Sequence, residues 1–135
     1  MVTKVYITTP DNSWKEATLE EKRKAAYWRM IILKKVFAEI EHARIMEYHS
    51  AFDDDIAPLN VELTKKMFGY ELPSEAAIVG KCVQRVIECD IVVFDYGWTS
   101  SKRCKVEHQT AFEYGKEIYT VNCNAGVFQF DRMPF

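Results

Sequence analysis

Two carboxylates, Asp95 and Glu107, occupy positions at which an α/β protein builds a ligand site. Residues 91–94 form a short, unbroken run of β-branched and aromatic side chains, which is typical of a strand covered on both faces. Asp95 directly follows this run, and Glu107 lies in the next segment, which predicts a helix. Because open α/β sheets bind ligands beyond the carboxyl ends of their strands, we expect both carboxylates to line a crevice there.

The helix around Glu107 carries this carboxylate on an otherwise apolar face. Gly115 is expected to end the helix, since glycine readily adopts the left-handed conformation after a helix terminus. Cys104, Glu107, Ala111 and Gly115 then share one face at helical spacing, and that face is expected to contact the sheet. A partly buried carboxylate is costly unless it has hydrogen-bond partners or a function. Glu107 is therefore either a functional group or the partner of Arg103 in an ion pair one turn apart.

The start of the same helix carries two cations, Lys102 and Arg103. The helix dipole disfavours positive charge in a first turn, so this placement has two interpretations. Either the long side chains extend into solvent, or they help Ser100, Ser101 and the free helix amides to bind an anion such as phosphate. With Glu107 nearby, the anion site is the favoured interpretation.

Strands and helices alternate along the rest of the chain. Residues 2–8 predict a strand that stops at the turn-forming run Thr9-Pro10-Asp11-Asn12. A capping box from Thr18 to Glu21 predicts a helix that continues into residues 42–49, where the pattern does not define its end. The apolar residues of this helix that are expected to face the sheet are Ile32, Leu33, Val36, Phe37 and Ile40.

The second half of the chain continues the alternation. Residues 60–72 predict a loop with a short helix, large enough to act as a lid, and Ser74 is expected to cap a helix with an apolar stripe over residues 78–87. The strand before Asp95, the helix with Glu107 and a strand ending at Val121 follow. This order predicts an α/β fold, with a parallel sheet, helices on both faces and right-handed crossovers.

Composition indicates one soluble globular domain over residues 1–123, followed by an apolar tail over residues 124–135. The chain has 135 residues, of which 48% are hydrophobic and 28% charged. The tail is expected either to add a last strand or to cover a neighbouring subunit. Residues 53–55 are three aspartates, for which a solvated loop is favoured over a cation site.

Charge and sequence pattern also exclude several classes of function. A net charge of −2 argues against broad nucleic-acid binding. There is no membrane-spanning run or signal-peptide pattern, and the four scattered cysteines indicate reduced thiols in a cytoplasmic protein. The three histidines show no ligand spacing, so neither a metal nor a cofactor is expected.

Several short motifs resemble the nucleoside 2-deoxyribosyltransferase-like superfamily. Tyr6-Ile7-Thr8-Thr9-Pro10 resembles its opening strand, and residues 89–95 (CDIVVFD) resemble its central strand, which ends in aspartate. Glu107-x-x-x-Ala111-x-x-x-Gly115 resembles its E-x-x-x-A-x-x-x-G signature. The loop from Gly97 to Glu107 is similar to the GW-x-x-S-x-G-A-x-x-E loop of small phage and bacterial members. The match extends over most of residues 2–121.

The resemblance implies a flavodoxin-like (Rossmann-like) three-layer sandwich with a mostly parallel sheet of four or five strands. It also implies a homodimer or higher homo-oligomer, with the ligand site at the carboxyl ends of the first and third strands. An edge-like second strand is expected to end near Ala57-Pro58.

By the same resemblance, Glu107 would be a nucleophile that attacks the anomeric carbon of a (deoxy)ribonucleotide and releases the base. Tyr6 would orient Glu107 through a hydrogen bond, and Asp95 would contact the leaving base and aid its protonation. Tyr96 or Trp98 would stack on the base. The other residues expected to contact the ligand are Thr8, Thr9, Pro10, Gly97, Ser100, Ser101, Lys102 and Arg103.

Two positions of the loop refine this expectation. Six residues before the nucleophile, the transferases carry an aspartate that binds the sugar, whereas the nucleoside-monophosphate N-glycosidases carry a serine that helps to bind the 5′-phosphate. Ser101 at this position favours a phosphorylated ligand. Arg103 stands where the family has a glycine that lets the backbone approach the ligand. Arg103 either grips a phosphate or blocks the pocket and neutralises Glu107.

Three functions compete on these grounds. The favoured one is an enzyme, a nucleotide N-glycosidase or a deoxyribosyltransferase that uses Glu107. The second is a pocket protein that binds or sequesters a nucleotide or a nucleotide-derived signal without cleaving it. The third is an interaction module whose apolar tail is the working surface.

Overall fold

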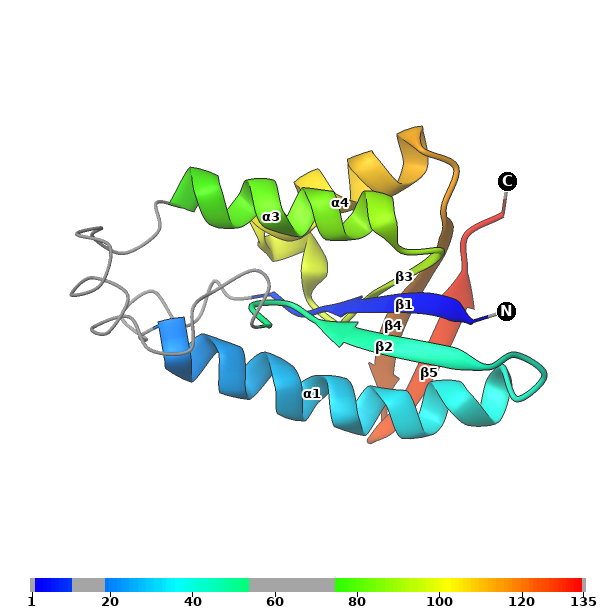
Figure 1. Ribbon diagram of the computed structural model, residues 1–135. Helices are drawn as coiled ribbons and strands as arrows, with labels where there is room; N and C mark the ends of the chain where they lie inside the picture. The colour runs from blue at the N-terminus through cyan, green and yellow to red at the C-terminus, as the bar shows by residue number, and fades with distance from the viewer. Residues whose placement is uncertain (1, 11–18, 54–74, 135) are drawn as a thin grey trace.

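A single sheet runs through the centre of the molecule. The computed structural model describes residues 2–10, 19–53 and 75–134, and within them five strands pair in the order β2-β1-β3-β4-β5 (Figure 1). The strands are β1 Thr3–Thr8, β2 Met46–Ser50, β3 Ile91–Phe94, β4 Glu117–Asn124 and β5 Val127–Arg132. β1 to β4 are parallel to one another, and β5 is antiparallel to β4. The prediction of an α/β fold with a mostly parallel sheet is therefore confirmed.

The strand order places a topological switch point between β1 and β3. From β1 the chain moves to one side of the sheet to form β2, and it then crosses to the other side to form β3. Thr8 pairs with Phe94, so the carboxyl ends of β1 and β3 lie next to each other. This is where an open α/β sheet opens a crevice for ligands.

Helices lie on both faces of the sheet (Figure 1). α3 (Glu75–Glu88) and α4 (Lys102–Glu113) lie on one face, and α1 (Leu19–Ile40) lies on the other. Alternate strand residues explain this arrangement, because successive side chains of a strand point to opposite faces. Tyr6 and Val92 pack in a cluster with Val86 of α3 and Cys104 of α4. Residues that alternate with these, including Ile7 and Val93, pack in a second cluster with α1.

Helix α1 differs from its prediction in two ways. It ends at Ile40, before the region of residues 42–49 into which the pattern was expected to continue. Leu33 and Phe37 are buried as expected, but Ile32 and Ile40 are 45% and 49% exposed. Position on the helix explains this result, because the buried stripe follows Ala26, Met30, Leu33 and Phe37. Thr18 of the capping box lies outside the described residues.

The second strand was predicted in the wrong place. β2 covers Met46–Ser50, several residues before the expected end near Ala57-Pro58. The chain turns directly after α1, where Thr3 N donates to Ile45 O at 2.9 Å and sets the register of β2 on β1. Phe52, with φ 60°, then takes the chain out of extended geometry. The expected loop and lid over residues 60–72 and the cap at Ser74 lie outside the described residues.

The apolar tail forms the last strand of the sheet. Ala125 and Gly126 have φ of 52° and 79°, the left-handed pair that a two-residue hairpin requires. The hairpin pairs β5 with β4, with Phe130 opposite Val121. Phe128 and Phe130 pack against the cluster on the α1 face. Of the two roles proposed for the tail, a final strand is the one that the structure shows.

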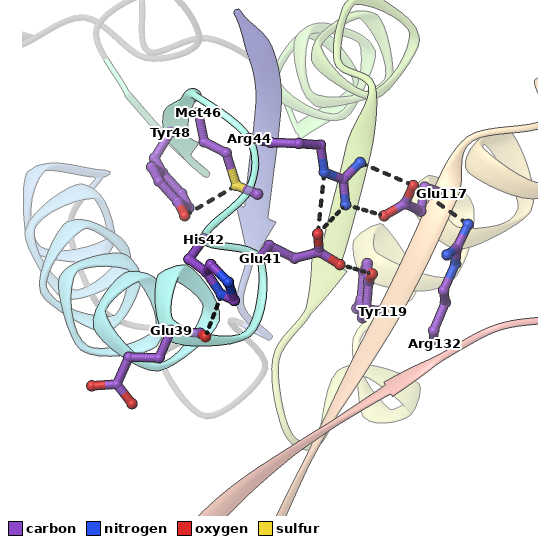
Figure 2. Close-up of polar contacts among 9 residues, drawn as sticks. All are labelled: Glu39, Glu41, His42, Arg44, Met46, Tyr48, Glu117, Tyr119 and Arg132. Carbon is purple, nitrogen blue, oxygen red and sulfur yellow. Dashed lines mark hydrogen bonds and ion pairs between the residues drawn. The ribbon is translucent and has the colours of Figure 1, made fainter.

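A polar network joins the end of α1 to the amino end of β4 (Figure 2). Arg44 donates to both carboxylate oxygens of Glu117, at 3.2 and 2.9 Å, and lies 2.6 Å from Glu41. Tyr119 donates to Glu41 at 2.7 Å, and Arg132 lies 3.5 Å from Glu117. The network fixes the end of α1 on the sheet near the amino end of β4, whereas the switch point lies at the carboxyl ends of the strands.

This network is expected to lose its contribution to stability in acid. Hydrogen bonds from Arg44 hold the pKa of Glu117 below its ordinary value. Burial alone would raise the pKa of Glu41, but hydrogen bonds from Tyr119 and Arg44 outweigh this effect and lower it. Groups with lowered folded pKa values stabilise the fold fully above their unfolded pKa, and this stabilisation is lost as pH falls through the folded pKa. Arg44→Met should therefore cost about 1 kcal/mol at neutral pH and progressively less below about pH 4.5.

Urea denaturation of both proteins between neutral and acid pH measures this difference. Lys24→Met is the matched control, because its ion pair with Glu20 is exposed, at 3.6 Å, on the surface of α1 and outside the network. A difference between wild type and Arg44→Met that stays constant across the pH range would contradict the assignment.

Candidate functional site

The carboxyl ends of β1 and β3 bring the predicted site segments together. Asp95 N donates to Thr8 O at 2.9 Å, so the residues that leave the two strands are neighbours. Gly97, with φ 83°, turns the chain into a short 3₁₀ helix, η2 (Trp98–Ser100). A Cβ added at Gly97 would lie 3.7 Å from Pro10 Cγ, so Pro10 packs beside this turn. The loop before α4 thus lies against the segment that follows β1, as the sequence predicts.

Glu107 lies in a buried cluster beneath this loop. Its side chain is completely buried, and Arg103 is only 5% exposed. Arg103 Nη1 donates to Glu107 Oε1 at 2.7 Å, and the Thr8 hydroxyl donates to the same oxygen at 2.9 Å. The prediction that Glu107 faces the sheet is therefore confirmed, and of the two interpretations of this carboxylate the structure shows the ion pair with Arg103.

Arg103 is held in place on several sides. Besides Glu107, its guanidinium donates to the Thr8 hydroxyl at 2.8 Å and to the Thr9 carbonyl at 2.5 Å. Its central carbon lies 4.7 Å from the centroid of the Phe52 ring, which is the distance of a cation–π contact. Burial alone would lower the pKa of Arg103, but the charge of Glu107 outweighs this effect and raises it. The guanidinium is therefore a permanent positive charge beside Glu107.

Phe52 contributes to the cluster in a strained conformation. It is 3% exposed and has φ 60°, a value that bulky residues rarely adopt. Strain of this kind persists only where the surrounding contacts compensate for it. The sequence contains no turn signal at Phe52, so its role could not be predicted.

Tyr6 lies near Glu107, and it belongs to the buried cluster that also contains Cys104 and Ala111. It is completely buried, and burial together with the charges of Glu107 and Cys82 raises the pKa of its phenol well above the ordinary value. The Tyr6 hydroxyl makes no hydrogen bond of normal geometry with the described residues. Tyr6 thus interacts with Glu107 electrostatically, and the orienting hydrogen bond implied by the resemblance stays a prediction.

Asp95 is also paired with an arginine. Arg29 Nε and Nη2 donate to its two oxygens at 2.6 and 3.1 Å, and the Tyr96 amide donates to Oδ1 at 2.7 Å. Asp95 is 3% exposed. The Arg29 guanidinium also lies 4.8 Å from the centroid of the Phe128 ring, so α1, β3 and β5 meet at this residue. Sequence reasoning missed Arg29, although its spacing from Ala26 and Leu33 places it beside the buried stripe of α1.

The serines and lysine before Glu107 divide into buried and exposed groups. Ser101 is completely buried and is the N-cap of α4, where its hydroxyl accepts from Cys104 N at 3.2 Å. Ser100 and Lys102 are exposed on either side of it, and Tyr96 is 59% exposed. Of the expected anion site, Arg103 points inward to Glu107, and Ser100 and Lys102 remain at the surface.

Trp98 stacks within the protein. Its ring lies 4.3 Å from the ring of His108 with an interplanar angle of 10°, and Phe94 lies 4.9 Å from His108. Burial lowers the pKa of His108, so the imidazole is neutral at neutral pH. Because one face of Trp98 is covered by His108, Tyr96 is the more accessible of the two aromatic residues expected to stack on a base.

The cysteines near Glu107 are poor nucleophiles, and the described residues contain no cluster arranged to hold a metal. No group of three histidine, cysteine or acidic side chains among residues 2–10, 19–53 and 75–134 is arranged to hold a metal. Cys82 and Cys104 are free and buried, and burial raises the pKa of their thiols to about 12 and about 11. Thiols with such values are poor nucleophiles at neutral pH.

Comparison with known proteins does not place the chain in a family. No family model matches the sequence, and a search of curated proteins finds no match. Across the described part of the chain, none of the helices combines the length and the apolar character needed to span a membrane.

Proposed function

We propose that this protein is a flavodoxin-like pocket protein that binds a phosphorylated nucleotide at the carboxyl ends of β1 and β3 without cleaving it. The observation that carries the proposal is the buried ion pair between Glu107 and Arg103 at the switch point. The pair stands where the family that the sequence resembles has its nucleophile and a glycine.

The ion pair argues against nucleophilic catalysis by Glu107. A nucleophilic carboxylate must approach the anomeric carbon with an oxygen that carries negative charge. Glu107 has no exposed surface, and its Oε1 accepts hydrogen bonds from both Arg103 and Thr8. Both bonds stabilise the carboxylate in its ground state, so each lowers its reactivity.

The surface above the buried pair retains groups suited to binding. Lys102 is exposed in the first turn of α4 and supplies a cation for a phosphate, whereas Arg29, although partly exposed, is already paired with Asp95. The exposed ring of Tyr96 lies just after β3, six residues before Lys102, and is suited to stacking on a base. Binding thus uses the residues at the surface, and the buried pair holds the loop and the strands together.

A second candidate is the N-glycosidase or deoxyribosyltransferase reaction. It is favoured by the convergence of Tyr6, Thr8 and Glu107 at the end of β1. This reaction requires Arg103 to leave Glu107 Oε1, so that the carboxylate gains access to the sugar. Both candidates include the homodimer that the resemblance implies, which analytical ultracentrifugation would test.

Incubation with a panel of nucleosides and (deoxy)nucleoside monophosphates separates the two candidates. We expect a monophosphate to bind and to be recovered intact after denaturation. Lys102→Met should weaken its binding about tenfold, because a charge-assisted hydrogen bond to phosphate is lost. Lys105→Met, which removes another exposed lysine of α4, is the matched control. Chromatography of the free base is the second measurement, and base release that Glu107→Gln abolishes would replace the proposal with the enzyme.

The serine at position 101 gives a sharper test of the phosphate. Ser101→Asp keeps an acceptor at the N-cap, since aspartate is a good capping residue, but it adds a negative charge. Affinity for the monophosphate should fall while affinity for the parent nucleoside stays the same. If Ser101→Asp binds the monophosphate as tightly as the wild type does, the phosphate is removed from the proposal.

A further inference from the structure

One edge of the sheet has no strand beside it in the described part of the chain. β5 is the last strand in the sheet order, and among the described residues it pairs with β4 alone. Met133 N donates to Ile118 O at 2.8 Å, in step with the register of the two strands, so the odd-numbered residues of β5 direct their backbone groups toward β4. The backbone N–H and C=O groups of Phe128, Phe130 and Arg132 therefore point away from β4. Such a row of donors and acceptors is a template for another strand.

The first part of this edge lacks the features that usually keep edge strands from pairing. Those features include proline, bulges and charged side chains. Residues 127–130 contain no proline and no charge, and their register on β4 is continuous. At the other edge of the sheet, β2 has five residues against six in β5, and it carries Glu47 and His49, which lie 2.8 Å apart. Of the two edges, that of β5 is the better suited to pairing.

Apolar side chains border the same edge on the α1 face of the sheet. Phe128 and Phe130 are only partly buried there. Arg29 of α1 contacts the Phe128 ring, and Ile32, which is 45% exposed, follows three residues later on the same flank of the helix. A strand that joined β5 would therefore gain apolar contacts in addition to backbone hydrogen bonds.

A second copy of this chain fits the edge in an antiparallel register. With Phe130 opposite Phe130 of the partner subunit, Phe128 lies opposite Arg132 of the partner subunit. Each outward-facing residue then meets an outward-facing residue, and each such pair exchanges two hydrogen bonds. The aliphatic stem of Arg132 would cover the ring opposite it, while the guanidinium keeps its position 3.5 Å from Glu117.

The other face of the strand favours this register over its neighbours. Gln129 lies opposite Asp131 of the partner subunit, so an amide faces a carboxylate. Oδ2 of Asp131 accepts from Asn122 at 2.5 Å, and Oδ1 lies 3.5 Å from the amide of Gln129 in its own strand, which leaves it able to accept a second bond. A register centred on Asp131 would oppose two carboxylates, and one centred on Gln129 would place Asp131 opposite Val127.

We propose that two copies of this chain form a symmetric dimer, in which the β5 strands pair antiparallel about Phe130 and join the two sheets into one. The two-fold axis makes each contact occur twice. This interface belongs to the homodimer that the proposed function includes, and it rests on that part of the function alone. A strand edge with an apolar border is a small interface, so the dissociation constant should lie in the micromolar range.

Amide hydrogen exchange of the ¹⁵N-labelled protein at increasing concentration tests this interface. The amides of Gln129 and Asp131 point toward β4 and should be protected in the monomer, whereas those of Phe128, Phe130 and Arg132 are open to solvent. Dimerisation should slow the exchange of these three amides selectively. Sedimentation velocity should show the monomer converting to a dimer over the same range of concentration.

Two substitutions of Arg132 separate the backbone from the side chain. Arg132→Pro removes an outward-pointing N–H without breaking a hydrogen bond to β4, and Arg132→Ala keeps this N–H. Because the dimer then loses two hydrogen bonds, dimerisation should be at least about tenfold weaker in Arg132→Pro than in Arg132→Ala. The Arg132 side chain is 60% exposed, so both variants should fold, which circular dichroism checks.

Gln129 tests the register, because substitutions of opposite charge should act in opposite directions. Gln129→Lys places a cation opposite Asp131 of the partner subunit, and Gln129→Asp places a second carboxylate there. The first should tighten the dimer and the second should weaken it, by about threefold to tenfold in each case. Gln129 is exposed, so neither change removes a core contact.

The possible failures of the proposal are distinguishable. A monomer at every concentration would overturn both this interface and the homodimer of the proposed function, while nucleotide binding would still be tested separately by Lys102→Met. A dimer with equal dissociation constants for Arg132→Pro and Arg132→Ala, or for the two Gln129 variants, would overturn the β5 interface alone. So would a dimer whose outward amides exchange as fast as those of the monomer.

Discussion

Replacing Arg103 with methionine is expected to lower the free energy of unfolding by about 3–5 kcal/mol, because it leaves a buried carboxylate without its countercharge. Glu107 is fully buried, and Arg103 is its ion-pair partner at 2.7 Å. Methionine fills much of the volume of the arginine stem, so the loss reflects charge more than packing. Urea denaturation at neutral pH measures the change.

A double-mutant cycle shows whether the effect belongs to the pair. Glu107→Met alone should also be strongly destabilising, since it leaves the Arg103 guanidinium buried beside an apolar side chain. The double variant should be more stable than either single variant, because replacing a complete buried ion pair by apolar residues is often neutral or stabilising. Additive losses in the double variant would contradict a coupled pair.

The matched control for the cycle is the surface pair of Lys24 and Glu20. These side chains are 66% and 54% exposed, and their charges lie 3.6 Å apart. Their coupling should be about 0.3–0.5 kcal/mol, the value for exposed pairs one turn apart on a helix. A large difference between the two cycles would show that burial, and not helical spacing, makes the Arg103 pair important.

Local patterns were sufficient to predict the elements around the site. The apolar run of residues 91–94 and the spacing of Cys104, Glu107 and Ala111 depend on neighbours in the sequence, and the structure confirms the strand, the helix and the buried carboxylate. Gly115, with φ 64°, ends α4 as expected. These features depend on periodicities of 2 and 3.6 residues, which a single sequence displays directly.

Features that depend on tertiary contacts could not be predicted in this way. The location of β2 depends on its pairing with β1 and on the turn after α1, and its short sequence has no strong apolar alternation. Arg29 and Phe52 reach the site from elements far away in the chain, and each contacts one of the predicted residues. A sequence pattern identifies what faces the core, but it does not identify which partner lies there.

The two carboxylates that indicated a site share one property that the sequence did not reveal. Each is paired with an arginine, Asp95 with Arg29 and Glu107 with Arg103. One arginine comes from α1 and the other from α4, so the pairs connect the switch point to helices on both faces of the sheet. This double pairing explains why binding at the surface is proposed in preference to catalysis at Glu107.

Phe37→Ala is expected to lower the free energy of unfolding by about 3–5 kcal/mol, the range for deleting a buried aromatic side chain. Phe37 is fully buried on α1, and its ring lies 4.9 Å from Tyr119 of β4 and 5.5 Å from Phe130 of β5. The loss would be a large part of the roughly 5–15 kcal/mol that stabilises a typical domain. Denaturant midpoints measure it, and Phe37→Leu, which fills most of the cavity, should cost about 1.5 kcal/mol or less.

The partner substitution shows whether β5 belongs to the same folded unit as residues 1–123. Phe130 is only partly buried, so Phe130→Ala alone should cost less than Phe37→Ala. If β5 packs stably on α1, the double variant should lose less than the sum of the two single variants, by about 0.5–1.5 kcal/mol, because the aromatic contact is then counted only once. Strict additivity, together with a negligible effect of Phe130→Ala, would mean that the tail contributes little to the core, and Phe37 would then be held by Tyr119 and the rest of the buried cluster on the α1 face.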